Sequence, residues 1–358
     1  MKAKIYTVHI LFQFREPAFQ FEEAWFSRQT SALIDIVSLS GRLKASVNDY
    51  INERVFNIRM LSESELESEY LDWKPSSPSS LTKAINFTWH YLLLESTATV
   101  DFEKLLHDSF PDAPERSKYS QPPLDEELAV DLLSTDLEKF SGDLILAAAI
   151  AKPGGLEPLD VVLYVNRKKE RSIRTGPHDL INLVVDYAVE VGWPKLHEIN
   201  IEEAWQWISR IPGLENGVPQ GDVGRAISAL SHVIGEDYSA VQLMWCMVGL
   251  EALYLKGKQG LSEQLFEKVQ TLLGPVNEHK RAFRGLYDYR SKFVHGDLDI
   301  PLIYTPYDGA EEFEKFYHET FDAMKRAAAL LLATLQKMVE LRIYSLEFRY
   351  ILEEKEQV

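Results

Sequence analysis

Polar and apolar residues alternate along the first 15 positions of the chain. This period of two is typical of a β-strand that buries one face and exposes the other. The apolar positions of this strand are Tyr6, Val8, Ile10, Phe12 and Phe14. Two short apolar runs, 144–150 and 161–165, stand on either side of a Lys-Pro-Gly-Gly turn and predict a second, hairpin-like pair of strands.

Helical spacing of apolar residues appears in the same half of the chain, at 19–43 and at 179–191. Between the predicted elements, 73–80 and 110–123 are rich in turn-forming residues and are expected to be exposed loops. Residues 1–205 are therefore predicted to form an α+β domain. The pattern gives no fold name for this domain, for which a sensory or regulatory role is the working expectation.

After Pro219 the pattern becomes helical, which predicts an all-α domain with the form of an antiparallel bundle. The domain boundary is expected within about 200–220, and we assign 206–358 to the bundle. The second of its helices is apolar nearly all round, so we expect it at the centre of the bundle, with Asp237 as its N-cap. Gly296 is suited to end the fourth helix. The five predicted helices span 221–234, 238–256, 261–273, 278–296 and 311–349.

Charge and composition limit the classes of function that the chain can have. The 358 residues carry 38 basic and 55 acidic side chains, a net charge of −17, so nucleic-acid binding would require a local basic patch. A single cysteine excludes an internal disulfide and a cysteine-rich zinc site, and the scattered histidines predict neither a metal nor another cofactor. No apolar run is long enough to cross a membrane, and the N-terminus lacks a cleavable signal. We expect a cytoplasmic protein.

One helix departs from the apolar pattern in an informative way. In the segment LYDYRSKFVHG at 286–296, Arg290 occupies a position where the helical stripe calls for an apolar side chain. A buried guanidinium must be paired or must line a cleft, because an unpaired buried charge is very costly. His295 follows at the end of the helix, where the helix dipole favours its protonated form.

Basic residues gather on this helix. Between 280 and 292 there are five of them and a single acid, Asp288, so the stretch carries +4 in an acidic chain and can attract anions. The five are Lys280, Arg281, Arg284, Arg290 and Lys292.

Arg290 and His295, with four residues between them, resemble the R-x4-H signature of HEPN domains, and LYDYRSKFVHG is similar to the Apea-like branch of that family. The helix that contains GLEALY resembles the second core helix of the branch, with Glu251 at its acidic position. The resemblance covers roughly 200–345. Ser291 stands where HEPN members often carry Asn, Asp or His.

The resemblance implies a metal-independent endoribonuclease that leaves 2′,3′-cyclic phosphate and 5′-hydroxyl ends. His295 would transfer protons and Arg290 would stabilise charge at phosphorus, which suits their side chains. The family further implies a homodimer formed through the bundle and a toxin-like role in abortive infection, or antiviral defence. The sequence does not say whether a regulatory partner controls the activity. The supporting residues would be Glu251, Ser291 and Tyr287, and the RNA-binding residues Lys280, Arg281, Arg284 and Lys292.

Two other functions compete with the nuclease. In the first, Arg290 and Glu251 form a structural pair, His295 caps the helix, and the bundle is a non-catalytic module that dimerises or binds a nucleotide or a partner protein. In the second, the chemistry lies in the N-terminal half and the bundle serves for dimerisation.

Other notable residues have simpler interpretations. Trp205 and Trp207 are expected to pack in a core, and Cys246 is expected to be a buried small hydrophobe. The basic residues at 167–174 are expected to lie exposed at a hairpin tip.

Overall fold

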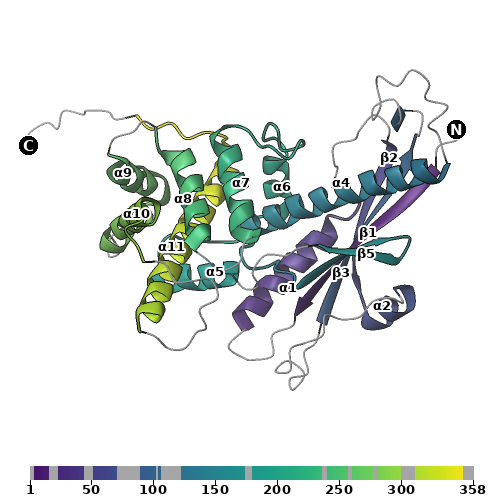
Figure 1. The fold of residues 1–358 in the computed structure, drawn as a ribbon, viewed down its shortest axis with the longest axis horizontal. Helices are drawn as coiled ribbons and strands as arrows, with labels where there is room; N and C mark the ends of the chain where they lie inside the picture. Colours follow the sequence, from purple (N-terminus) through teal and green to yellow (C-terminus); the bar gives the residue numbers. More distant parts are fainter. Residues whose placement is uncertain are drawn as a thin grey trace, which may run out of the picture. The chain divides into compact units, whose positions relative to one another are not determined.

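The structure, a computed structural model, describes residues 4–15, 23–43, 51–70, 89–101, 104–105, 122–173, 180–235, 240–256, 260–276, 280–299 and 311–349. The chain divides into two compact units. The first unit contains 1–182 and 197–206, and the second contains 183–196 and 207–358. An antiparallel sheet with helices comes first in the chain, and a helical region follows it (Figure 1).

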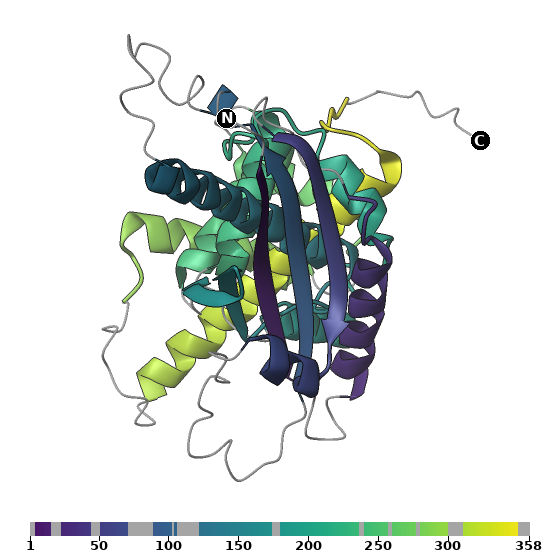
Figure 2. The ribbon, with the colours of Figure 1, turned by 90° about the vertical axis from the view of Figure 1, so that its right-hand side faces the viewer.

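The first unit is built on a five-stranded antiparallel sheet in the order β2-β3-β1-β4-β5. The central strand, β1 (Lys4–Arg15), pairs with β3 (Trp89–Val100) on one side and with β4 (Asp160–Val165) on the other. The edges of the sheet are β2 (Ile51–Leu61) and β5 (Lys168–Ile173). Figure 2 shows the three long strands β1, β3 and β2 side by side.

The strand predicted at the N-terminus is confirmed as β1, but the expectation that it exposes one face is wrong. Val8, Ile10 and Phe12 are buried on one face, and Leu11 is equally buried on the other. Helix α4 (Pro122–Ala151) packs on β1, β3 and β4. On the side that carries Leu11, a hydrophobic cluster joins the strands to Leu66 of α2 (Glu63–Glu69).

The run at 144–150, predicted as a strand, lies instead in the last two turns of α4. Its apolar residues continue a spacing of three and four that begins upstream, and its alanines favour a helix. This end of α4 is buried nearly all round, so its sequence lacks an amphipathic pattern. The residues that carry the spacing are Ala129, Leu133, Leu137, Phe140, Leu144, Ala147 and Ala151, all of them buried.

The two helices predicted in the first half are confirmed as α1 (Glu23–Ser38) and α5 (Leu180–Val191), and a short α6 (Ile201–Ile208) follows. The loop predicted at 73–80 lies outside the described residues. Of the loop predicted at 110–123, the structure describes only residues 122–123, which begin α4.

The helical unit contains the helices that the spacing predicts. They are α7 (Gly221–Gly235), α8 (Ala240–Tyr254), α9 (Leu261–Leu273), α10 (Lys280–His295) and α11 (Glu311–Leu341). Asp237, the predicted cap of α8, lies outside the described residues. Helix α8 contacts all four of the others. Gly249 permits this packing, because a Cβ there would lie 3.0 Å from Leu331 Cδ1 and 3.2 Å from Ala229 Cβ.

Helix α11 ends at Leu341, eight residues before the predicted end. Arg342 adopts a left-handed conformation with φ 54°, and the Ile343 amide donates to the Met338 carbonyl at 3.1 Å. This is the hydrogen bond that closes a Schellman motif. The segment after α11 contains Leu346, which is buried. In the sequence, such apolar residues resemble a continuation of the helical stripe.

In the part of the chain that the structure describes, no helix combines the length and the apolarity needed to cross a lipid bilayer.

Candidate functional site

The end of α10 is fixed by its own backbone. Gly296 has φ 76°, and the Asp297 amide donates to the Lys292 carbonyl at 2.9 Å, so the helix closes in a Schellman motif. His295 is therefore the last residue of α10 and is exposed. The sequence prediction that Gly296 ends this helix is confirmed.

Arg290 lies about 1.4 turns earlier on α10 and pairs with Glu251 of α8. Its Nη2 donates to Glu251 Oε2 at 3.2 Å, and its Nε lies 3.2 Å from Glu251 Oε1. The two side chains are 24% and 23% exposed, so the pair is partly covered but open to solvent. A guanidinium has five N–H donors, and Arg290 can therefore hold Glu251 while it presents other donors to an anion.

Burial raises the pKa of Glu251, and the charge and hydrogen bond of Arg290 oppose that rise. The Arg290 guanidinium also lies 5.7 Å from the centre of the Tyr287 ring, at a distance typical of a cation–π contact. Burial first, and then the Glu251 charge, raise the pKa of Tyr287. Glu251 and Tyr287 thus both contact Arg290.

Arg290 and His295 share a helix but not a face. Five residues along an α-helix correspond to a rotation of about 140° and a rise of about 7.5 Å. Ser291 is half-buried and Lys292 is exposed between them. Arg290 faces α8, whereas His295 extends into solvent at the helix end, so the two side chains do not form one preassembled pair within the chain.

The basic stretch at 280–292 is only partly described. The backbone of Lys280, Arg281 and Arg284 lies in the first turns of α10, but the structure does not describe their side chains. Lys292 is the one RNA-binding candidate whose exposure is described.

Helix α8 contacts the four other helices of its unit, as predicted for a central helix, but it is not buried all round. Val241 is 47% exposed and Val248 is 40% exposed, two turns apart on one side of the helix. Half-buried Trp245 lies between them and stacks on His232 with ring centres 4.0 Å apart. The other side of α8, which includes Leu243, Cys246 and Leu250, is buried, so α8 carries an apolar face that its own unit leaves open.

Trp205, Trp207 and Cys246 take the core positions predicted for them. Trp205 packs against Phe140 at 4.8 Å, and Trp207 stacks on Tyr344 at 5.5 Å while its Nε1 donates to the Ile343 carbonyl. Cys246 is fully buried, and this burial raises the pKa of its thiol. These residues support packing rather than chemistry.

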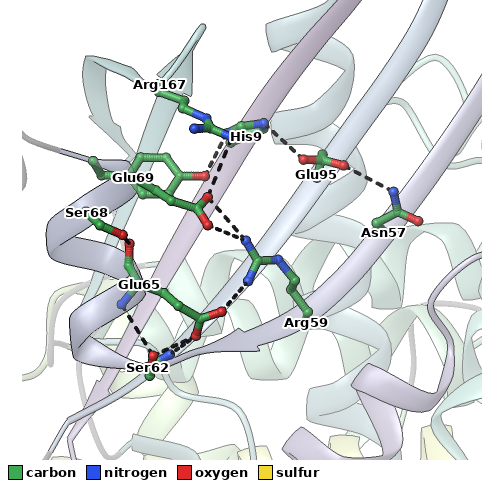
Figure 3. A network of polar contacts seen from close by, with 10 residues as sticks. His9, Asn57, Arg59, Ser62, Glu65, Ser68, Glu69, Glu95 and Arg167 are labelled. Carbon is green, nitrogen blue, oxygen red and sulfur yellow. Dashed lines mark hydrogen bonds and ion pairs between the residues drawn. The ribbon is translucent and has the colours of Figure 1, made fainter.

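A second polar cluster, which the sequence did not single out, lies in the first unit (Figure 3). His9 Nδ1 and the Tyr70 hydroxyl are 2.7 Å apart, and His9 Nε2 lies 3.3 Å from Glu95 Oε2. Figure 3 also shows Arg59 between two carboxylates of α2, those of Glu65 and Glu69. Arg59 Nη1 lies 3.3 Å from Glu65 Oε1, and its Nη2 lies 3.3 Å from Glu69 Oε2. In an alternating strand, His9 occupies a position that normally faces water, which is why the pattern concealed it.

The cluster joins α2 to the sheet. His9 is 5% exposed and Tyr70 is 1% exposed, so neither side chain is open to a substrate in this structure. Burial lowers the pKa of His9, and the positive charge of Arg167 adds to this effect against the opposing charge of Glu95. The arrangement favours a structural role and gives little support to chemistry in the N-terminal half.

The described residues contain no group of three or more His, Cys, Asp or Glu side chains that could hold a metal ion. Nothing matches this chain among models of protein families, among curated proteins or among solved structures.

Proposed function

We propose that this protein is a metal-independent endoribonuclease of the HEPN type, with Arg290 and His295 as its catalytic residues. The observation that carries the proposal is the position of Arg290: its charge is held by Glu251 at 3.2 Å, yet its side chain remains 24% exposed. An arginine in a closed core would be structural only, whereas this one can reach a ligand.

The chemistry assigns one task to each residue. The 2′-hydroxyl of RNA attacks the adjacent phosphorus, the bond to the 5′-oxygen breaks, and the products are a 2′,3′-cyclic phosphate and a 5′-hydroxyl. The ordinary pKa of histidine lies close to neutrality, so His295 can remove the proton from the nucleophile or donate one to the leaving group. Arg290 keeps its charge at every relevant pH and stabilises the extra negative charge at phosphorus.

A second copy of the chain would complete the site. Arg290 and His295 lie about 140° apart around α10, so one phosphate cannot readily contact both within one chain. A two-fold axis beside α10 would bring the Arg290 of each copy toward the His295 of the other. The open apolar face of α8, with Val241 and Val248, offers a surface for such a dimer.

The biological role that we propose is a toxin-like effector in cytoplasmic defence against phage, with the first unit restraining the nuclease or sensing a trigger. The competing function is a non-catalytic binding module. The contact between Arg290 and Glu251 favours that module to the extent that it neutralises the arginine.

The experiment compares RNA cleavage by the wild type, Arg290→Ala and His295→Ala in the presence of EDTA, with a labelled oligonucleotide. We expect cleavage by the wild type, cyclic phosphate ends on the products, and a loss of at least about a hundredfold in each variant, the contribution typical of a general acid or base.

Two matched controls test whether the loss is specific. His318→Ala removes another exposed histidine of the helical unit, and Arg225→Ala removes an arginine whose partner is the neighbouring Asp222. Both should cleave like the wild type, and circular dichroism should show that every variant folds. Cleavage that survives both Arg290→Ala and His295→Ala would contradict the proposed site. No cleavage by any form, with RNA or a partner protein still bound, would favour the binding module.

A further inference from the structure

A pocket of about 550 Å³ opens in the helical unit, and neither Arg290 nor His295 lines it. Its walls come from the end of α8, from α9 and from the segment that follows α11. The residues that matter for its chemistry are Tyr254, Lys256, Gln264, Lys268, Phe348 and Arg349. The volume lies within the range of sites that bind small molecules.

Lys268 is a buried cation at the wall of this pocket. The residue is 8% exposed, and its Nζ donates to the Tyr254 carbonyl at 2.7 Å and to Gln264 Oε1 at 3.0 Å. Both acceptors are neutral, and among the described residues no carboxylate forms an ion pair with Lys268. An ammonium group has three donors, so one remains for a ligand.

A second cation lies close to the first. Burial, followed by the charge of nearby Lys256, lowers the pKa of Lys268. Lys256 is exposed and likewise has no ion-pair partner among the described residues. Two like charges near each other without a counter-ion destabilise the folded protein, and an anion bound by both would remove that cost.

The remaining charges do not neutralise the pair. Arg349 adds a third cation, and Glu347 is the single acid that lines the pocket. Glu347 lies 3.8 Å from Arg349, and the two side chains are 68% and 85% exposed, so water screens their interaction. The lining therefore carries +2 in a chain whose net charge is −17.

We propose that this pocket binds the phosphate group of an organic phosphate monoester, with Lys256 and Lys268 as its charge partners. A phosphate monoester carries −1.5 to −2 near neutral pH, which matches the charge of the lining. Phe348 supplies an apolar wall for the organic part, and its ring lies 5.6 Å from Lys268 Nζ. The site does not include Arg290 or His295, so its test is independent of the ribonuclease proposal.

The test uses phenyl phosphate as the probe and phenol as its uncharged counterpart, with binding to the full chain measured by isothermal titration calorimetry. We expect phenyl phosphate to bind and phenol to bind at least about tenfold more weakly, because a hydrogen bond to a charged group contributes at least that factor. Lys256→Ala and Lys268→Met should each weaken phenyl phosphate binding by about tenfold or more.

Lys337→Ala is the matched control, because Lys337 is a half-exposed lysine of the same unit that pairs with Glu340 and lies outside the pocket. It should bind phenyl phosphate like the wild type. Lys256 is exposed, so Lys256→Ala keeps the test valid even if Lys268→Met fails to fold. A bound phosphate also raises the pKa of Lys268, so binding in alkaline buffer should take up protons in the wild type and not in Lys268→Met.

Two arms distinguish the source of the phosphate. One is a 2′-O-methyl oligonucleotide with a 5′-phosphate, which cannot be cleaved by 2′-hydroxyl attack, and the other is the same oligonucleotide with a 5′-hydroxyl. Tighter binding of the phosphorylated oligonucleotide than of its 5′-hydroxyl counterpart would assign the site to RNA ends, and equal binding of the two would assign it to a small metabolite. Equal binding of phenol and phenyl phosphate, or wild-type affinity in both lysine variants, would overturn the proposal.

Discussion

Arg290 shows how one residue can serve both the fold and the proposed chemistry. It stands in the apolar stripe of α10, and Glu251 compensates its charge from α8. Because both side chains are about one quarter exposed, water weakens the attraction between them. The pair therefore orients the guanidinium without neutralising it as completely as a closed core would.

A double-mutant cycle with Arg290→Met and Glu251→Gln should give a coupling free energy of about 1 kcal/mol, as for a partly exposed pair. The cycle also predicts a pH effect. Without Arg290, burial raises the pKa of Glu251 further above 4.5, so the folded state binds more protons than the unfolded state. Chemical denaturation should show Arg290→Met losing stability from about pH 4.5 to pH 7 relative to the wild type. The same loss in the double variant would contradict this assignment.

For His9, in the first unit, we expect the opposite pH dependence: stability is lost as the pH decreases. Its pKa is lowered chiefly by burial, so below the ordinary value of 6.5 the unfolded state binds the proton more readily than the folded state does. The contribution of neutral His9 to the free energy of unfolding is therefore fully present above about pH 6.5 and is lost as the pH decreases. Thermal unfolding between pH 7.5 and 5.5 should show a smaller pH dependence in His9→Gln than in the wild type. His318→Gln, at an exposed position, should behave like the wild type, and an unchanged slope in His9→Gln would contradict the prediction.

At the scale of elements, the β4–β5 hairpin has a turn that its sequence does not favour. Asn166 and Arg167 form a two-residue loop with φ 48° and 64°, the conformation of a type I′ turn, in which Asn-Gly is preferred. Arg167 is 61% exposed, as expected for a hairpin tip, and its ion pair with Glu69 is long at 3.8 Å.

Arg167→Gly should therefore stabilise the protein by about 0.5–1 kcal/mol, because glycine adopts the left-handed conformation without steric cost. Arg167→Ala removes the same charge and ion pair but keeps a Cβ, so it isolates the backbone effect. The free energy of unfolding in urea measures both. Equal stability of the glycine and alanine variants would show that backbone conformation does not limit this turn.

The elements divide into those that the sequence could reveal and those that it could not. Helices α7, α9 and α10 have one buried and one exposed side, and their spacing and terminal glycines located them closely. The end of α4 and the strand β1 are buried on more than one side, so periodicity conveys little about them. Helix α8 is central, as its apolar sequence predicted, but that sequence did not reveal that Val241 and Val248 are exposed.

The functional residues also divide into those that local sequence spacing reveals and those that it does not. The break in the apolar stripe at Arg290 and the acid in the α8 sequence suggested a contact that the structure contains. The cluster around His9 and the pocket around Lys268 depend on residues far apart in the chain. Lys268 shares its pocket with Phe348, 80 positions later, and no local spacing joins them.

For the whole molecule, the net charge of −17 bears on the proposed dimer. Two copies of an acidic chain repel each other, so an apolar contact must supply the attraction. The open face of α8, with Val241 and Val248, lies on the helix that also carries Glu251, the partner of Arg290. If two copies meet there, assembly and cleavage depend on the same surface.

Val248→Glu should therefore convert the dimer into a monomer and abolish RNA cleavage, because it adds a charge to an apolar interface and increases the repulsion between copies. Analytical ultracentrifugation measures the first effect, and added salt should strengthen the wild-type dimer by screening that repulsion. Val189→Glu is the matched control, since Val189 is 76% exposed on α5 of the same unit and should leave both properties unchanged. A dimer that persists in Val248→Glu would place the interface elsewhere, and a monomeric wild type that cleaves RNA would show that one chain holds a complete site.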